Sequence, residues 1–323
     1  MTDFNQIKKK RIFITGGAGF IGTALTQSLL DYNEIVVYDN LHRDAISKSG
    51  LLSSKNVKLI HGDILDYDNL VKSMVGSHIV VHLAAIAGVD AVMEDMARTL
   101  EVNIIGTYNV LEASKTLSNL ERLVNFSTSE VFGTYAYKVD ELHQTSQGSV
   151  GEARWTYAVS KLAGEHISYA YYRKYGIPIV SIRPFNIYGP NQVGSGAIKA
   201  FVLRAIKNEN LIIHGDGSQI RAWCYIDDLI NGVLLSIISP KAVGQFFNIG
   251  NPRSTITIYN LALEIIRLSG ASSNIEFVPL PYTDIEIRIP NIDKARFILG
   301  YEPKIELQEG ILRTLKWYKE NSL

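Results

Sequence analysis

Tyr157 and Lys161 have the residue types and the spacing for proton transfer to and from an alcohol. They stand four residues apart in a helical pattern, which places them on one face of the helix. A free tyrosine is a weak base because its pKa is about 10, but a neighbouring ammonium stabilises the phenolate and lowers that pKa. Such a pair can accept a proton from an alcohol while a hydride leaves its carbon. The same spacing is common in ordinary helices, so the pair is informative only beside a hydride acceptor.

A second polar group follows an apolar run, where "LVNFS" (residues 123–127) continues into Thr128, Ser129 and Glu130. A continuous apolar run is typical of a parallel strand that is covered on both faces. Open parallel sheets bind their ligands at the carboxyl ends of their strands. We therefore expect these side chains to face a substrate; the alternative is that Glu130 only solvates a loop.

The stretch "RIFITGGAGFIG" (residues 11–22) predicts a phosphate-binding turn with Gly16, Gly19 and Gly22 between a strand and a helix. Glycines permit a tight turn and a close backbone approach to a pyrophosphate, although they also serve purely structural turns. Asp39 ends the next apolar run, where a carboxylate can bind a ribose hydroxyl and repel a 2′-phosphate. This favours NAD over NADP, and the nearby Arg43 would weaken the preference.

The elements that must position these residues alternate along the first half of the chain. Apolar runs at residues 11–15, 35–38, 57–61, 79–83, 123–127 and 178–182 are separated by helical patterns at 20–31, 67–75, 93–116 and 155–175. Strand and helix in alternation predict an α/β fold with a Rossmann-type doubly wound parallel sheet. After about residue 183 the pattern changes to Gly- and Pro-rich segments. We expect a dinucleotide-binding domain at 1–183 and a smaller substrate lobe at 184–323, with segments that cross back.

Bulk composition excludes several other classes of protein. The 323 residues carry 32 Lys plus Arg and 32 Asp plus Glu, so no charge surplus indicates nucleic acid or an acidic membrane surface. One cysteine, Cys224, rules out an internal disulfide and a Cys-rich metal site, and the histidines show no metal-ligand spacing with it. Neither a secretory signal nor a membrane span is recognisable. We expect a cytoplasmic protein without a metal.

Five motifs in order then resemble one family: TGGAGFIG (15–22), HLAA (82–85), STSE (127–130), YAVSK (157–161) and RPFNIYGP (183–190). The chain resembles the extended short-chain dehydrogenase/reductase family of NAD-dependent nucleotide-sugar epimerases, dehydratases and decarboxylases. The resemblance implies that Tyr157 deprotonates the sugar O4 while C4 gives a hydride to NAD, with Lys161 holding the nicotinamide ribose and Thr128 assisting. The residues expected to bind NAD are Gly16, Gly19, Phe20, Ile21, Gly22, Asp39, Asn40, Asp63, Ile64, Leu83, Ala84, Ala85, Tyr157 and Lys161.

For the remaining site residues the resemblance implies a nucleoside-diphosphate sugar as substrate, with UDP favoured. Asn186 would meet the nucleotide or diphosphate, and Arg221 and Arg288 would clamp the phosphates; the alternative for each arginine is a surface ion pair. Ser129 and Tyr282 complete the expected substrate set. Asp63 and Ile64 would meet the adenine, unless Asp63 caps the following helix. The family also implies a homodimer through a four-helix contact of the helices at 93–116 and 155–175.

Three reactions stay open, because all of them begin with a 4-keto sugar. Decarboxylation of a UDP-glucuronate-type uronic acid and 4,6-dehydration both act at C5, where Glu130 would assist. A UDP-sugar 4-epimerase would not need that carboxylate. Ser129 stands where glucose-type dehydratases carry an Asp, whereas Arg154-Trp155 before Tyr157 resembles decarboxylases, and Arg154 is a candidate for binding a uronic carboxylate. A hypothesis of another class is a non-catalytic NAD-binding regulator.

Overall fold

The computed structural model describes residues 4–280 and 284–321, and its centre is a sheet of seven parallel strands. The strand order is β12-β7-β5-β4-β1-β2-β3. The order reverses between β1 and β4, which is where doubly wound sheets bind their ligands. The strands are β1 (Arg11–Thr15), β2 (Glu34–Asp39), β3 (Val57–His61), β4 (Ile79–His82), β5 (Arg122–Phe126), β7 (Ile179–Pro184) and β12 (Phe246–Ile249).

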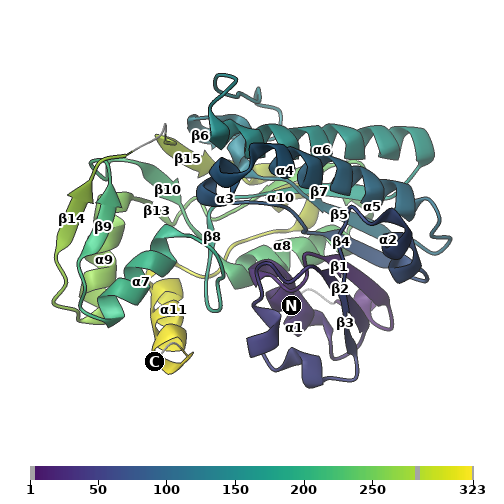
Figure 1. The fold of residues 1–323 in the computed structure, drawn as a ribbon, viewed down its shortest axis with the longest axis horizontal. Coiled ribbons are helices and arrows are strands. Elements are labelled where there is room, and N and C mark those ends of the chain that lie inside the picture. Colours follow the sequence, from purple (N-terminus) through teal and green to yellow (C-terminus); the bar gives the residue numbers. More distant parts are fainter. Residues whose placement is uncertain (1–3, 281–283, 322–323) are drawn as a thin grey trace.

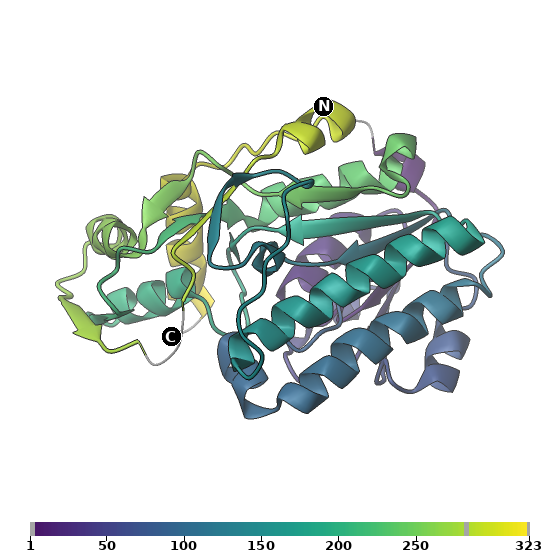
Figure 2. The same cartoon turned by 90° about the horizontal axis from the view of Figure 1, so that it is seen from above.

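Helices cover both faces of this sheet, which explains why its strands are continuously apolar. On β1, Ile12 and Ile14 belong to one hydrophobic core and Phe13 belongs to another on the opposite face. The first face carries α1 (Phe20–Leu29) and α8 (Ile226–Ile238), and the second carries α2 (Tyr67–Met74), α5 (Gly106–Ser114) and α6 (Ala153–Tyr175) (Figures 1 and 2). The predicted doubly wound parallel sheet is confirmed.

Most of the helix predicted over residues 93–116 is present, because the backbone is helical from residue 96 to residue 114, but a break at Asp95 separates this stretch from a shorter helix before it. The segments are α3 (Val89–Glu94), α4 (Met96–Leu100), a π-helical turn (Glu101–Ile105) and α5. Asp95 has an extended backbone, with φ of −149°, and its carboxylate accepts a hydrogen bond from the N–H of Arg98. This side chain therefore caps a new helix close to the start of the predicted helical stretch.

A smaller lobe lies beside the central sheet, at the left of Figure 1. It contains α7 (Ala197–Ile206), α9 (Ile258–Ser269), α11 (Leu307–Asn321) and a parallel pair of strands. The chain crosses between the two halves in both directions: β12 joins the central sheet, while β6 joins a four-stranded sheet of later strands. The remaining elements are β6 (Tyr135–Val139), β8 (Ile187–Tyr188), β9 (Leu211–His214), β10 (Ile220–Ala222), β11 (Cys224–Tyr225), β13 (Thr255–Thr257), β14 (Ile275–Val278), β15 (Ile287–Pro290) and α10 (Asp293–Leu299), with 3₁₀ turns Asn5–Ile7, Ile46–Lys48, Leu51–Ser53, Ser129–Phe132 and Pro240–Ala242.

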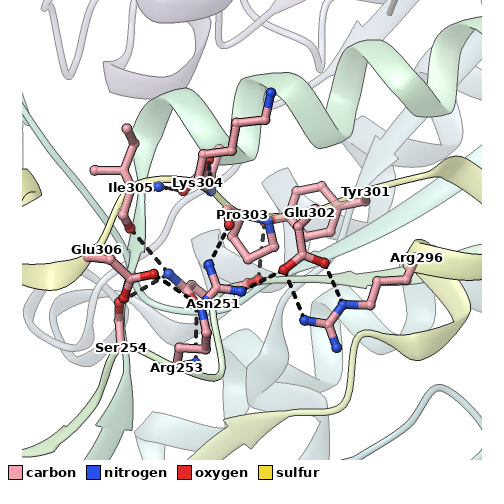
Figure 3. A network of polar contacts seen from close by, with 12 residues as sticks. Asn251, Arg253, Ser254, Arg296, Tyr301, Glu302, Pro303, Lys304, Ile305 and Glu306 are labelled. Atoms are coloured by element: carbon pink, nitrogen blue, oxygen red, sulfur yellow. Dashed lines mark hydrogen bonds and ion pairs between the residues drawn. The ribbon is translucent and has the colours of Figure 1, made fainter. Parts of the chain in front are cut away.

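A polar network around Arg253 fastens the segment before α11 to the loop after β12 (Figure 3). The guanidinium of Arg253 donates to Glu306 at 3.0 Å, to Glu302 at 2.5 Å and to the carbonyl of Pro303 at 2.6 Å. Glu302 also accepts a hydrogen bond from Arg296 at 2.7 Å. These contacts tie α10, α11 and the β12–β13 loop together and thereby hold the lobe against the central sheet.

Candidate active site

The turn between β1 and α1 is built from glycines because the neighbouring backbone leaves no room for side chains. Gly16 has a left-handed φ of +65°, and a Cβ on it would lie 2.5 Å from the backbone nitrogen of Ala84. A Cβ on Gly22 would lie 2.4 Å from the Cα of Gly17, so helix and turn meet through their backbones. α1 begins at Phe20, and a helix N-terminus in this position attracts phosphate.

This turn is one wall of a cavity of about 880 Å³, which is within the range of small-molecule sites. The glycine turn offers N–H groups to a pyrophosphate, Asp39 lies where a ribose would be held, and Tyr157 and Lys161 line the same space. A dinucleotide therefore fits the residues present. The structure brings together in this lining Gly16, Gly19, Phe20, Ile21, Gly22, Asp39, Asn40, Asp63, Ile64, Leu83, Ala84, Ala85, Tyr157 and Lys161.

Asp39 is buried at the end of β2, and both of its carboxylate oxygens accept backbone hydrogen bonds. One accepts from the N–H of Ala18 at 3.0 Å and the other from the N–H of Leu41 at 2.7 Å. Burial raises the pKa of this carboxyl, and the two N–H groups oppose the rise. Each oxygen keeps a further acceptor site that a ribose hydroxyl can use.

Asp63 lines the same cavity beyond β3, but it does not cap the helix that follows. Its carboxylate pairs with Arg98 at 3.0 Å and accepts from the N–H of Leu65 at 2.9 Å. The N-cap of α2 is Asp66, which accepts from the N–H of Asn69. The capping alternative is therefore wrong, and Asp63 helps to shape the cavity wall.

Tyr157 and Lys161 lie on successive turns of α6, and Thr128 reaches them from the end of β5. Burial and the negative charge of Glu130 raise the pKa of Tyr157, while the hydrogen bond from Thr128 and the charge of Arg43 oppose the rise. Burial lowers the pKa of Lys161 to about 8. The tyrosine thus needs nearby positive charge to ionise, and a protonated Lys161, one turn further along α6, is a candidate source of it.

A buried network behind the cavity holds His82, the first residue of the HLAA motif. Its ring nitrogens lie 2.7 Å from the Thr15 hydroxyl and 3.0 Å from the Thr107 hydroxyl. Burial lowers the pKa of this histidine to about 3, so the ring is neutral. Thr107 donates to the carbonyl of Asn103, whose amide donates to Ser160, the residue before Lys161.

Three arginines and two carboxylates meet beyond Thr128, and we call them the arginine cluster: Arg154, Arg221, Arg288, Glu130 and Asp284. Arg288 donates to Glu130 at 2.8 Å, and Arg154 lies 3.7 Å from Glu130. Asp284 lies 3.2 Å from Arg154 and 3.4 Å from Arg221. Among the residues that the structure describes, three arginines thus face two carboxylates, so the cluster carries one surplus positive charge in a nearly buried place. Such a cluster can accept an anion.

The charges of the cluster keep its carboxylate ionised. Burial alone would raise the pKa of Glu130, but Arg288, Arg154 and Arg221 together hold it below its ordinary value. Burial lowers the pKa of Arg221 to about 10. Arg288 is 2 % exposed and Arg221 is 8 % exposed, so the alternative of surface ion pairs is wrong for both.

The other predicted substrate residues differ in where they lie. Ser129 is buried beside Thr128 at the start of the 3₁₀ turn. The side-chain amide of Asn186 donates to the carbonyl of Ala222 at 2.8 Å, so it holds β10 in place. Tyr282 lies outside the described residues.

Neither of two charged residues near the site was predicted as a site residue. Asp284 precedes Arg288 by four residues, and only the fold brings it to Arg154 and Arg221. Arg43 was considered only for cofactor preference, yet it donates to the carbonyl of Ala87 across the cavity at 2.6 Å.

In residues 4–280 and 284–321, no group of three or more His, Cys, Asp or Glu side chains is arranged to hold a metal ion. No helix in this part of the chain is long and apolar enough to cross a membrane.

The fold and the site define a dinucleotide-binding α/β enzyme with a tyrosine–lysine pair. Residues 12–250 match the model of the NAD dependent epimerase/dehydratase family, and the chain belongs to this family. It is an NAD-dependent enzyme, and NAD is its cofactor.

Individual relatives cover almost the whole chain. A UDP-N-acetyl-alpha-D-glucosaminuronate decarboxylase of Bacillus cytotoxicus is 32 % identical over 97 % of this chain and 98 % of its own. A UDP-glucuronate 4-epimerase of Thermodesulfobacterium geofontis is 34 % identical over 95 % of this chain and 96 % of its own. The crystal structure of UDP-glucuronic acid 4-epimerase from Bacillus cereus, solved with UDP-glucuronic acid and NAD, has a TM-score of 0.86 at 31 % identity and covers 96 % of this chain and 99 % of that chain.

Proposed function

We propose that the protein decarboxylates a UDP-linked uronic acid after oxidising its sugar at C4. The observation that carries the proposal is the place of Arg154, three residues before Tyr157 on α6 and 3.7 Å from Glu130. Residues three apart on a helix are neighbours. A sugar whose C4 hydroxyl reaches Tyr157 therefore presents its C5 substituent to Arg154 and Glu130.

In the first step Tyr157 takes the proton of the C4 hydroxyl. The ammonium of Lys161 stabilises the phenolate, and the hydroxyl of Thr128 fixes the ring by its hydrogen bond. NAD, when bound, accepts the hydride from C4. Because burial raises the pKa of Tyr157, the step depends on the positive charge of Lys161.

The second step breaks the C5–C6 bond. With a ketone at C4, the sugar is a β-keto acid, and the electron pair of the C5–C6 bond moves toward the C4 oxygen as carbon dioxide leaves. Arg154 binds the C6 carboxylate, while the ionised Glu130 close by repels it. Loss of carbon dioxide relieves this repulsion. C5 of the resulting enolate then takes a proton from a water molecule that Glu130 and Arg288 orient.

Several features support a UDP-linked substrate. The relatives described above act, by their names, on UDP-linked uronic sugars. The surplus positive charge of the arginine cluster suits a substrate with both a diphosphate and a carboxylate. We assign NAD binding to residues 1–183 and the nucleotide sugar mainly to residues 184–323, with β6 and β12 as crossing segments.

A substrate panel tests this function. The protein is incubated with NAD and, separately, UDP-glucuronate, UDP-N-acetylglucosaminuronate and UDP-glucose, and products are identified by mass. We expect the uronates to lose carbon dioxide and Tyr157→Phe to be inactive. A product that has lost water would indicate dehydration instead, and wild-type turnover by Tyr157→Phe would refute the role of that residue.

A second candidate is 4-epimerisation of the same uronic acid. One observation in its favour is that Arg288 balances the negative charge of the ionised Glu130 through an ion pair. Another is the similarity of the chain to two UDP-glucuronate 4-epimerases. In that reaction the C6 carboxylate is retained and the hydride returns to the other face of C4. A product of unchanged mass with inverted C4 would select this candidate.

We also propose that the protein is a homodimer. Leu100, Ile105 and Tyr108 of the α4–α5 stretch and Val159 of α6 are exposed apolar residues on helices that lie side by side (Figure 2). Pairing this face with its copy would form a four-helix contact. Light scattering is expected to give a dimer, and Val159→Glu to give a monomer; a monomeric wild type would refute the proposal.

A further inference from the structure

Arg43 lines the cofactor cavity together with Ala87 and Gly88. It follows β2 by four residues, and its guanidinium donates to the carbonyl of Ala87 at 2.6 Å, on the loop after β4. In the sheet, β1 lies between β2 and β4, and the glycine turn leaves the end of β1. The side chain therefore spans the strand whose end carries the phosphate-binding turn.

Two glycines leave room for the guanidinium. A Cβ on Gly88 would lie 3.2 Å from one of its nitrogens, and a Cβ on Gly194 would lie 3.0 Å from another. Both glycines have positive φ, of +92° and +79°. Gly194 belongs to the loop between β8 and α7, so Arg43 meets two other segments around the cavity, this loop and the loop after β4.

The charge of Arg43 is available to an anion. Arg98, the other arginine of the cavity lining, is paired with Asp63 and Glu101. In residues 4–280 and 284–321, no carboxylate lies within ion-pair distance of Arg43, which donates to a neutral carbonyl. Its field reaches Tyr157, so it acts on the same space in which a dinucleotide lies. A planar guanidinium suits the oxygens of a pyrophosphate.

We propose that Arg43 retains the cofactor, binding the pyrophosphate of NAD and closing the cavity toward Ala87. The dinucleotide then stays bound between turnovers. A hydride taken from C4 has to return to the sugar before the product leaves, so the sugar departs with an alcohol at C4 and the net reaction is redox-neutral. The retention itself does not depend on which reaction occurs at C5.

Release of NAD tests this without any substrate. The NAD-loaded protein is diluted and passed over a gel-filtration column, and the nucleotide left on it is measured by chromatography over time. We expect Arg43→Gln to release NAD at least about tenfold faster than wild type, since a charge-assisted contact is lost. Arg43→Lys keeps the positive charge but loses the planar guanidinium, and its rate of NAD release is expected to lie between those of wild type and Arg43→Gln.

Arg204→Gln is the matched control, because Arg204 is a half-exposed arginine on α7 that faces Glu209. It removes the same charge away from the cavity and is expected to release NAD as wild type does. Thermal unfolding of the NAD-free proteins checks that Arg43→Gln is folded. Equal release rates for Arg43→Gln and wild type would overturn the proposal. So would unchanged NAD release with a selective loss of NADP affinity, because Arg43 would then read a 2′-phosphate.

Discussion

Two largely buried arginine–glutamate contacts, Arg183–Glu165 and Arg288–Glu130, are built differently. Arg183 meets Glu165 through two parallel hydrogen bonds, of 2.8 and 2.7 Å, and both side chains are at most 9 % exposed. Arg288 meets Glu130 through one hydrogen bond of 2.8 Å, and gives another to the carbonyl of Gly133. A further arginine, Arg154, also faces Glu130.

Under the proposed function, the difference separates a structural contact from one that meets the substrate. In the Arg183–Glu165 pair each charge is matched by its partner, and Phe132 and Phe246 flank the guanidinium. In the arginine cluster the arginines exceed the carboxylates, and Glu130 remains 22 % exposed. A closed pair has nothing left for a ligand, whereas an open cluster can exchange one of its partners for a substrate anion.

Glu130→Gln is expected to give the largest effect on activity. Product formation from UDP-glucuronate should fall by about a thousandfold, because the group that assists at C5 is lost, while C4 oxidation still occurs. Stopped-flow absorbance of reduced nicotinamide should therefore show a transient without later product. Normal turnover would make Glu130 a bystander and favour epimerisation.

Arg154→Gln should be next in size. We expect kcat/KM for a uronate to fall by about a hundredfold, as for the loss of a buried charge partner. Oxidation of UDP-glucose, which has no carboxylate at C6, should change much less. Equal losses with both sugars would show that Arg154 does not bind the carboxylate.

Arg183→Met is expected to affect stability instead. It leaves Glu165 buried without its partner, which should cost about 3 kcal/mol in the free energy of unfolding. Urea denaturation measures this, and Arg288→Met is the matched variant. Arg288→Met should lose activity but less stability, because Glu130 still faces Arg154. A larger loss of stability in Arg288→Met than in Arg183→Met, with activity retained, would contradict the distinction between the two contacts.

The smallest effect concerns pH. Burial lowers the pKa of Lys161 to about 8, so kcat/KM should decline above that pH as the ammonium loses its proton. Glu165 opposes the shift, because its negative charge raises the pKa of the lysine. Glu165→Gln should therefore move the decline to lower pH. If the decline stays in place or moves to higher pH, the charge of Glu165 does not raise the pKa of Lys161.

Sequence patterns within short segments predicted the strands and the glycine turn, whose structure depends on neighbouring residues. The runs that form β1 and β3 were predicted to the residue, β1 because both of its faces are covered, and the glycine turn has a spacing of its own. The break at Asp95 was missed because the helical periodicity continues across it. Short-range propensity does not reveal that a side chain will cap a new helix.

Contacts between distant segments could not be predicted. Glu130 and Arg288 were both singled out, but their ion pair joins residues 158 positions apart, and Arg288 had been assigned to phosphate. Asp284 and the span of Arg43 to Ala87 likewise depend on the folded arrangement. The proposed exchange of a partner for a substrate anion rests on the surplus of positive charge in the arginine cluster. Only the assembled site reveals that surplus.

The most direct test of the central claim is the fate of C6. The NAD-loaded protein is given UDP-glucuronate labelled with carbon-13 at C6, and the label is followed by NMR. We predict that it appears as carbon dioxide and bicarbonate, in step with an unlabelled UDP-pentose. Label that remains in a UDP-linked hexuronate would contradict decarboxylation.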